Sequence, residues 1–110
     1  DDGIGIEKDV EKAVYWYSEA IAQGENFLSG CNLGDIYRKG KDTVAKDLEK
    51  AFKAYFTSSH PYALFRIGEA YENGYGTEKD MESAKKYYSL SAQNGHRLGI
   101  IQCKRLNIKY

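Results

Sequence analysis

The chain has 110 residues, sixteen Lys and Arg against sixteen Asp and Glu, and a formal charge of zero. This length suits one ordinary domain, and the balanced charge lacks the basic excess of nucleic-acid-binding proteins. Because no apolar run approaches the ~20 residues of a membrane-spanning helix, we expect neither nucleic-acid binding nor membrane insertion. Two cysteines, Cys31 and Cys103, are too few for a disulfide scaffold or paired zinc ligands, so we expect buried thiols.

Three related nine-residue words mark the first, third and fifth predicted helices. They are DVEKAVYWY from Asp9, DLEKAFKAY from Asp47 and DMESAKKYY from Asp80, at successive offsets of 38 and 33 residues. Each Asp can cap a helix by accepting a hydrogen bond from free backbone amides, and the Glu two residues later favours the positive end of the helix dipole. Alanine and tyrosine recur along one face of each helix. We therefore predict helices over residues 8–23, 47–59 and 80–94.

A second word marks the helices that alternate with these. NLGDIYRKG ends at Gly40 and RIGEAYENG ends at Gly74, 34 residues later. Gly34 and Gly68 fall inside these words, where glycine costs up to ~1 kcal/mol relative to alanine, so we expect a neighbouring helix to cross closely there. The words predict helices over 27–39 and 62–73, and an amphipathic last segment predicts a sixth over 96–107. Periods of this length indicate a repeat architecture.

The connections between the predicted helices are not identical. Asp42 stands where the later unit has Gly76, and the loop that contains it is one residue longer. The segment TSSHPYA shortens the middle of the chain by about one helical turn. Pro61 suits the first position of the following helix, with Ser59 or His60 as its cap. We expect a local change in superhelical curvature at this segment.

Two Gly-x-Gly segments, GIGIEKD and GYGTEKD, raise the alternative of a phosphate-binding loop. The dinucleotide fingerprint needs a preceding buried strand and a third glycine, where these segments have Lys8 and Lys79. We therefore interpret both segments as joints between helices.

Together the words resemble the Sel-one-like repeats (SLR), relatives of the tetratricopeptide repeats. The residues that match the family pattern in the last full unit are Ala63, Gly68, Tyr71, Gly74, Gly76, Asp80, Ala84, Tyr87, Tyr88 and Gly95. The resemblance covers nearly the whole chain, although the last segment has Cys103 and Lys104 where the family has Leu-Gly. It implies an all-α fold, a right-handed α/α superhelix (solenoid) of antiparallel helix pairs with about six helices. We divide this single domain into approximate units 1–26, 27–61 and 62–95 and a terminal helix, 96–110. Cys31 and Cys103 then lie two units apart, beyond the reach of a disulfide.

The resemblance also implies a non-catalytic scaffold or adaptor that binds a partner protein or peptide, without cofactor or metal. In related superhelices the first helix of each unit lines the concave face. Removing the packing positions of these helices leaves a candidate partner-binding set: Leu28, Cys31, Asp35, Arg38, Tyr62, Phe65, Glu69, Glu72, Leu98, Ile101 and Arg105. An apolar centre ringed by charges of both signs suits an amphipathic or extended peptide. Equally, some members of the set complete the core.

Other functions stay open on the sequence alone. The family includes immunity proteins, so a dedicated inhibitor of a toxin or effector is an alternative. A hydrolase would need a nucleophile with its base, which no Cys/His or Ser/His/Asp spacing here provides; for His60 and His96 we expect cap or surface roles. Exposed solenoid ends are sticky and offer a homodimer or a junction with further repeats. We expect an excised segment or a processed chain, because the sequence opens without Met. No disulfide pattern indicates the compartment.

Overall fold

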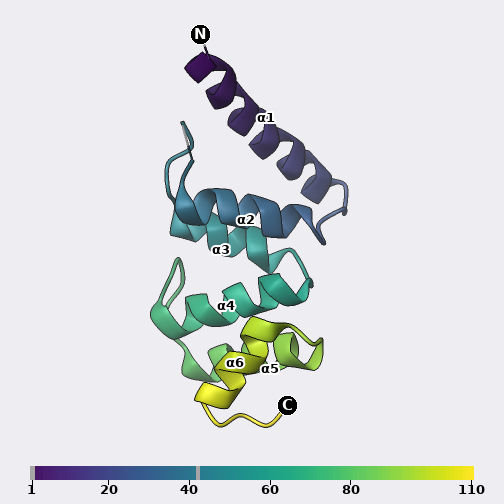
Figure 1. The fold of residues 1–110 in the computed structure, drawn as a ribbon, viewed down its shortest axis with the longest axis vertical. Coiled ribbons are helices and arrows are strands. Elements are labelled where there is room, and N and C mark those ends of the chain that lie inside the picture. The colour runs from purple at the N-terminus through teal and green to yellow at the C-terminus, as the bar shows by residue number, and fades with distance from the viewer. Residues whose placement is uncertain (1, 42) are drawn as a thin grey trace.

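The computed structural model describes residues 2–41 and 43–110, with side chains from Asp9 onward. The regular elements of this part are six α-helices: α1 (Asp2–Ala22), α2 (Ser29–Lys39), α3 (Leu48–Phe56), α4 (Pro61–Asn73), α5 (Met81–Gln93) and α6 (Arg97–Arg105). They follow one another along an axis 52 Å long, in a stack 25 by 21 Å across (Figure 1). The predicted all-α solenoid of about six helices is confirmed. Within the described residues, none of these helices combines the length and apolar character that crossing a membrane requires.

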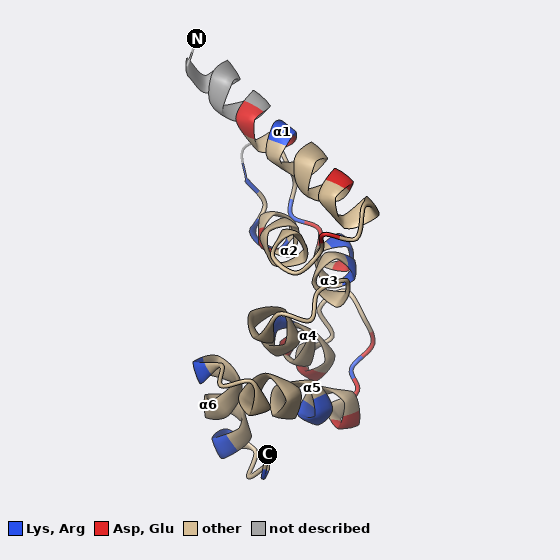
Figure 2. Ribbon diagram, turned by 90° about the vertical axis from the view of Figure 1, so that its right-hand side faces the viewer, with Lys and Arg blue, Asp and Glu red and all other residues tan. Residues whose placement is uncertain are grey.

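The helices form two unequal layers. Each helix packs on the next, and α4 also touches both α2 and α6, whereas no contact joins α1, α3 and α5 to one another within the described part of the chain. The two rows are visible side by side, with α2, α4 and α6 toward the left and α3 and α5 toward the right (Figure 2). Because the even-numbered helices approach one another more closely than the odd-numbered ones, they form the inner, concave side of the stack.

Side chains at the helix starts confirm most of the predicted caps. The Asp47 carboxylate accepts from the backbone N–H of Lys50 at 3.0 Å, and Asp80 accepts from that of Ser83 at 3.2 Å. Pro61 occupies the first turn of α4, and Nδ1 of His60 accepts from the backbone N–H of Tyr62 at 3.1 Å. Of the two caps considered for α4, His60 is therefore the one used.

The cap predicted at Asp9 is wrong, because α1 begins at Asp2 and Asp9 lies inside it. The reason lies in the helix that precedes each of the other caps. The backbone N–H of Asp47 donates to the carbonyl of Tyr37 at 2.8 Å, and that of Asp80 donates to the carbonyl of Tyr71 at 2.9 Å. No helix precedes Asp9 in the described residues, so nothing fixes a turn there and the helix runs back past it. The predicted exchange at Asp42 falls outside the described residues.

Helix α3 is also shorter than predicted, ending at Phe56 rather than at residue 59. The buried Ser58 stops it by making long-range bonds. Its hydroxyl donates to the carbonyl of Phe27 at 2.5 Å and accepts from the backbone N–H of His60 at 3.0 Å. The segment after α3 is thereby tied to the start of α2 instead of continuing the helix.

The core repeats one packing device, a tyrosine laid against a helical glycine. A Cβ on Gly68 would lie 2.7 Å from Cδ1 of Tyr88, and a Cβ on Gly34 would overlap the ring of Tyr55 in the same way. These tyrosines belong to two core clusters, the first containing Cys31 and the second containing Cys103. Both cysteines are buried and free, as expected from the sequence. The close crossing predicted at the two glycines is confirmed.

Candidate protein-binding face

The eleven candidate residues all lie on or beside the three inner helices. Leu28 immediately precedes α2, which carries Cys31, Asp35 and Arg38; α4 carries Tyr62, Phe65, Glu69 and Glu72; α6 carries Leu98, Ile101 and Arg105. Cys31 is only 6% exposed and Phe65 only 5%, and each belongs to a core cluster. These two complete the core, the alternative that the sequence had left open for part of the set. The other nine are half-buried or exposed.

Asp35 is the hub of a polar network at the centre of this face. Its Oδ1 accepts from the hydroxyl of Tyr55 at 2.5 Å and from that of Tyr62 at 2.6 Å. Nε of Arg38 donates to the same Tyr55 hydroxyl at 3.1 Å, and its guanidinium lies 3.6 Å from Asp35. Burial and the hydrogen bond to Asp35 raise the pKa of Tyr55 far above its usual range. The phenol is therefore a permanent donor that joins α3 to α2.

Arg66, which the sequence analysis did not select, extends this network along α4. Its Nε donates to the hydroxyl of Tyr62 at 2.9 Å, and its Nη1 donates to Glu69 at 2.8 Å. The guanidinium carbon lies 5.2 Å from the ring centres of both Tyr62 and Phe65, within cation–π range. Burial opposes the charge, but the bonds to Tyr62 and Glu69 outweigh it and raise the pKa of Arg66. Its spacing of four from Tyr62 and three from Glu69 was the available signal.

Glu72 repeats the arrangement one unit later and joins three helices. Its Oε1 accepts from the hydroxyl of Tyr88 on α5 at 2.7 Å and from Nη2 of Arg105 on α6 at 2.5 Å. The Arg105 hydrogen bond lowers the pKa of Glu72 against the opposing effect of burial, and the Tyr88 hydroxyl adds to the lowering. Asp35, Glu69 and Glu72 thus form a line of carboxylates, each held by donors of this chain.

The histidines and cysteines are not arranged for catalysis. Burial raises the pKa of the thiols of Cys31 and Cys103, which disfavours the nucleophilic thiolate. His60 uses Nδ1 as a helix cap, and His96 lies at the start of α6 with its ring against Tyr62 and Phe65. Burial lowers the pKa of His96. No group of three or more potential metal ligands occurs within the described part of the chain.

Comparison with known proteins agrees with the repeat seen in the structure. The Sel1 repeat model matches residues 1–25, 31–53 and 61–96. Activator of C kinase protein 1 from Saccharomyces cerevisiae is 31% identical over 106 residues, which are 88% of this chain and 17% of that protein. The ERAD-associated E3 ubiquitin-protein ligase component HRD3 from Candida glabrata is 34% identical over 87 residues, 78% of this chain and 10% of that protein.

A third relative, the Chitin synthase regulator SKT5 from Saccharomyces cerevisiae, is 29% identical over 103 residues, which are 90% of this chain and 14% of that protein. The chain therefore spans less than a fifth of the length of each of these curated relatives. The family model, by contrast, covers most of the chain, and its matches contain the glycines and tyrosines that pack in the core. The chain belongs to the Sel1 repeat family.

Proposed function

We propose that the chain is a non-catalytic scaffold that binds a partner protein or peptide on its concave face. We define the concave face by the nine candidate residues that solvent reaches: Leu28, Asp35, Arg38, Tyr62, Glu69, Glu72, Leu98, Ile101 and Arg105. The observation that carries the proposal is that these residues come from three helices of one layer and share one face of the stack. A continuous face of this kind is how solenoids present binding surfaces.

The chemistry of the concave face suits an amphipathic segment. Leu28 is 60% exposed at one end, and Leu98 and Ile101 are 36% and 44% exposed near the other. Between them lies the band of hydrogen-bonded charges centred on Asp35 and Glu72. Apolar anchors supply most of the binding energy at protein interfaces, and surrounding polar groups fix the register. We expect a helix or extended peptide with apolar side chains at both ends of the contact.

The names of the relatives support a role that depends on other proteins. One is an activator of a kinase, one a component of a ubiquitin ligase and one a regulator of a synthase. Each name describes a protein that acts on or within a larger enzyme system. By analogy we assign this chain a scaffold role, with the partner left to experiment.

The test compares three forms of the chain as bait in cell extract: wild type, the double variant Leu28→Asp with Ile101→Asp, and the control Met81→Asp. Met81 is 39% exposed at the start of α5, outside the concave face, so it matches Ile101 in exposure. Circular dichroism first establishes that all three remain helical. Captured proteins are quantified by mass spectrometry, and the affinity of each purified partner is then measured by calorimetry.

We expect the double variant to bind the partner at least about tenfold more weakly, since each change buries a charge against an apolar contact. The control should retain wild-type affinity. Equal binding by all three forms would place the partner on another surface and contradict the proposal.

A further inference from the structure

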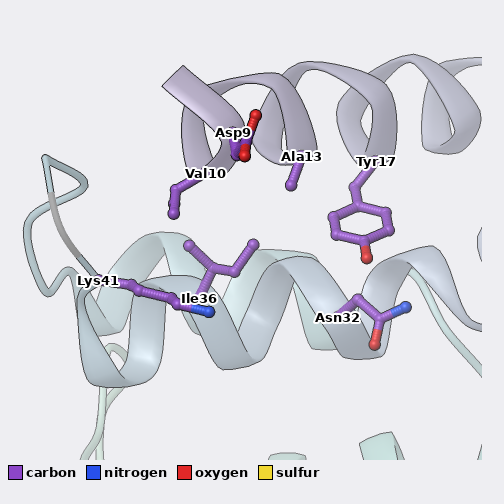
Figure 3. Close-up of a pocket in the computed structure, with 7 residues that line it drawn as sticks. All are labelled: Asp9, Val10, Ala13, Tyr17, Asn32, Ile36 and Lys41. Atoms are coloured by element: carbon purple, nitrogen blue, oxygen red, sulfur yellow. The ribbon is translucent and has the colours of Figure 1, made fainter. Parts of the chain in front are cut away.

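An open cleft lies between α1 and α2, away from the concave face. It has a volume of about 360 Å³ and is lined by Asp9, Val10, Ala13, Tyr17, Asn32, Ile36 and Lys41. Val10, Ala13 and Tyr17 point from α1 toward α2, and Ile36 points back at them (Figure 3). The cleft therefore has an apolar floor and polar rims.

The equivalent place in the next repeat is closed. The offsets of 38 and 34 residues found in the sequence map each lining residue onto a residue between α3 and α4: Asp47, Leu48, Ala51, Tyr55, Arg66, Ala70 and Tyr75. All but Asp47 line a cavity there of only about 20 Å³. The same lining thus encloses almost no space in one repeat and a wide cleft in the other.

Helix α2 closes the second place. It supplies Arg38 to the lining, and its Gly34 receives the ring of Tyr55. As a result Ala51 and Tyr55 are 2% and 3% exposed. Their equivalents Ala13 and Tyr17 stay half-buried, because no helix in the described residues covers α1 as α2 covers α3.

Trp16 shows the same incomplete packing on the neighbouring position. Its side chain is 64% exposed and touches the ring of Tyr15 edge-on at 5.1 Å. The equivalent residue of α5 is Tyr87, whose ring stacks on Tyr71 of α4 with centres 5.8 Å apart. Tyr71 lies three residues after Gly68, so one inner helix receives both aromatic rings of its partner.

We propose that the α1–α2 cleft binds a helix of the Sel1 inner type that comes from outside these 110 residues. Its glycine lies against the ring of Tyr17, as Gly34 lies against Tyr55 and Gly68 against Tyr88. A carboxylate within the following turn accepts from the Tyr17 hydroxyl, as Asp35 and Glu72 do in the two closed repeats. A tyrosine three residues after the glycine stacks on Trp16.

A second copy of this chain is not the occupant. Its one inner helix without an outer partner is α6, which lies at the far end of the stack. At the position of Gly34 and Gly68 this helix carries Lys104, an exposed charged side chain. A lysine there leaves no room for the ring of Tyr17, so the two free ends of the solenoid are not complementary.

The test uses a peptide with the sequence of residues 25–46, which contains α2 with Gly34, Asp35 and Tyr37. The peptide has no tryptophan, and Trp16 is the single tryptophan of the chain, so fluorescence reports only this site. The peptide is added to the full chain, and in a second arm it is joined to Asp1 through a flexible Gly/Ser linker, which raises its effective concentration to the millimolar range. The control peptide carries Gly34→Leu.

We expect the peptide to shift the Trp16 emission to shorter wavelength, with a dissociation constant below about 1 mM. The Gly34→Leu peptide should cause no shift. On the chain, Ala13→Leu should abolish the response by filling the cleft, whereas Glu19→Leu, an exposed residue of α1 that does not line it, should leave the response unchanged.

The absence of a shift in the tethered form would overturn the proposal, as would equal shifts with the two peptides. Self-association that buries Trp16 without added peptide, measured by light scattering, would identify a second copy as the occupant and would also overturn it. The outcome is independent of the concave face, since the partner assay there uses other residues.

Discussion

At the scale of single residues, the packing depends on two glycines that lack a side chain for a steric reason. Gly68 lies in the middle of α4 with the ring of Tyr88 against its Cα, and Tyr88 is 1% exposed. Its hydroxyl is held by Glu72 at 2.7 Å. A ring fixed at both its edge and its hydroxyl has no alternative position. Gly34 and Tyr55 repeat the arrangement, with Asp35 as the acceptor.

Gly68→Ala should therefore destabilise the protein, although the same change in an open helix stabilises by up to ~1 kcal/mol. The new Cβ would lie 2.7 Å from the Tyr88 ring, and overpacking of this kind costs about 1–3 kcal/mol. Urea unfolding followed by circular dichroism measures the change. Lys85→Ala, at an exposed position of α5, should shift the unfolding free energy by less than about 0.5 kcal/mol. A more stable Gly68→Ala variant would show that the ring relaxes freely.

At the scale of helices, Glu72 joins α4 to both α5 and α6. Because the hydrogen bond from Arg105 lowers the pKa of Glu72 from an ordinary value of 4.5, the carboxylate binds protons more weakly in the folded chain than in the unfolded chain. Its contribution to stability is therefore present above pH 4.5 and is lost as the pH falls through the lowered pKa.

Glu72→Gln should reduce stability near pH 7, and the gap to the wild type should narrow as the pH is lowered through 4.5 toward 3, since wild-type Glu72 then becomes neutral as well. Thermal melts at several pH values measure this. Glu78→Gln, at an exposed position in the loop before α5, should follow the wild-type curve in parallel. A gap of constant size at every pH would assign the loss to packing and not to the charge.

The sequence was sufficient to predict the features that depend on local chemistry. Asp47, Asp80 and His60 were recognised as caps because a cap needs only a short polar side chain and the next turn. Asp9 carries the same word but is not a cap, since its turn depends on a carbonyl from a preceding helix. Arg66 was missed because its bonds with Tyr62 and Glu69 follow from how α4 is presented, which the repeat pattern does not encode.

At the scale of the whole molecule, the solenoid is built from contacts between neighbouring helices, so each unit takes its burial from the next. Residues with one sequence pattern therefore differ in environment according to their place in the stack. Tyr17, Tyr55 and Tyr88 occupy equivalent positions, but only the last two are fully buried. Of the candidate set, the sequence placed all eleven residues on the inner helices, yet it did not separate the core members Cys31 and Phe65 from the exposed ones. Burial there depends on how far one unit is rotated against the next.

The paired carboxylates of the concave face also bear on how the proposed binding should respond to ionic strength. Asp35, Glu69 and Glu72 are already bonded to groups of this chain, so a charged partner can reach them only by exchanging one bond for another. The net gain would then come from Leu28, Leu98 and Ile101, whose apolar contacts mobile ions do not screen. We expect the dissociation constant of the partner to change by less than about threefold between roughly 50 and 500 mM sodium chloride. A tenfold weakening or more in the same titration would mean that the partner is held by charge.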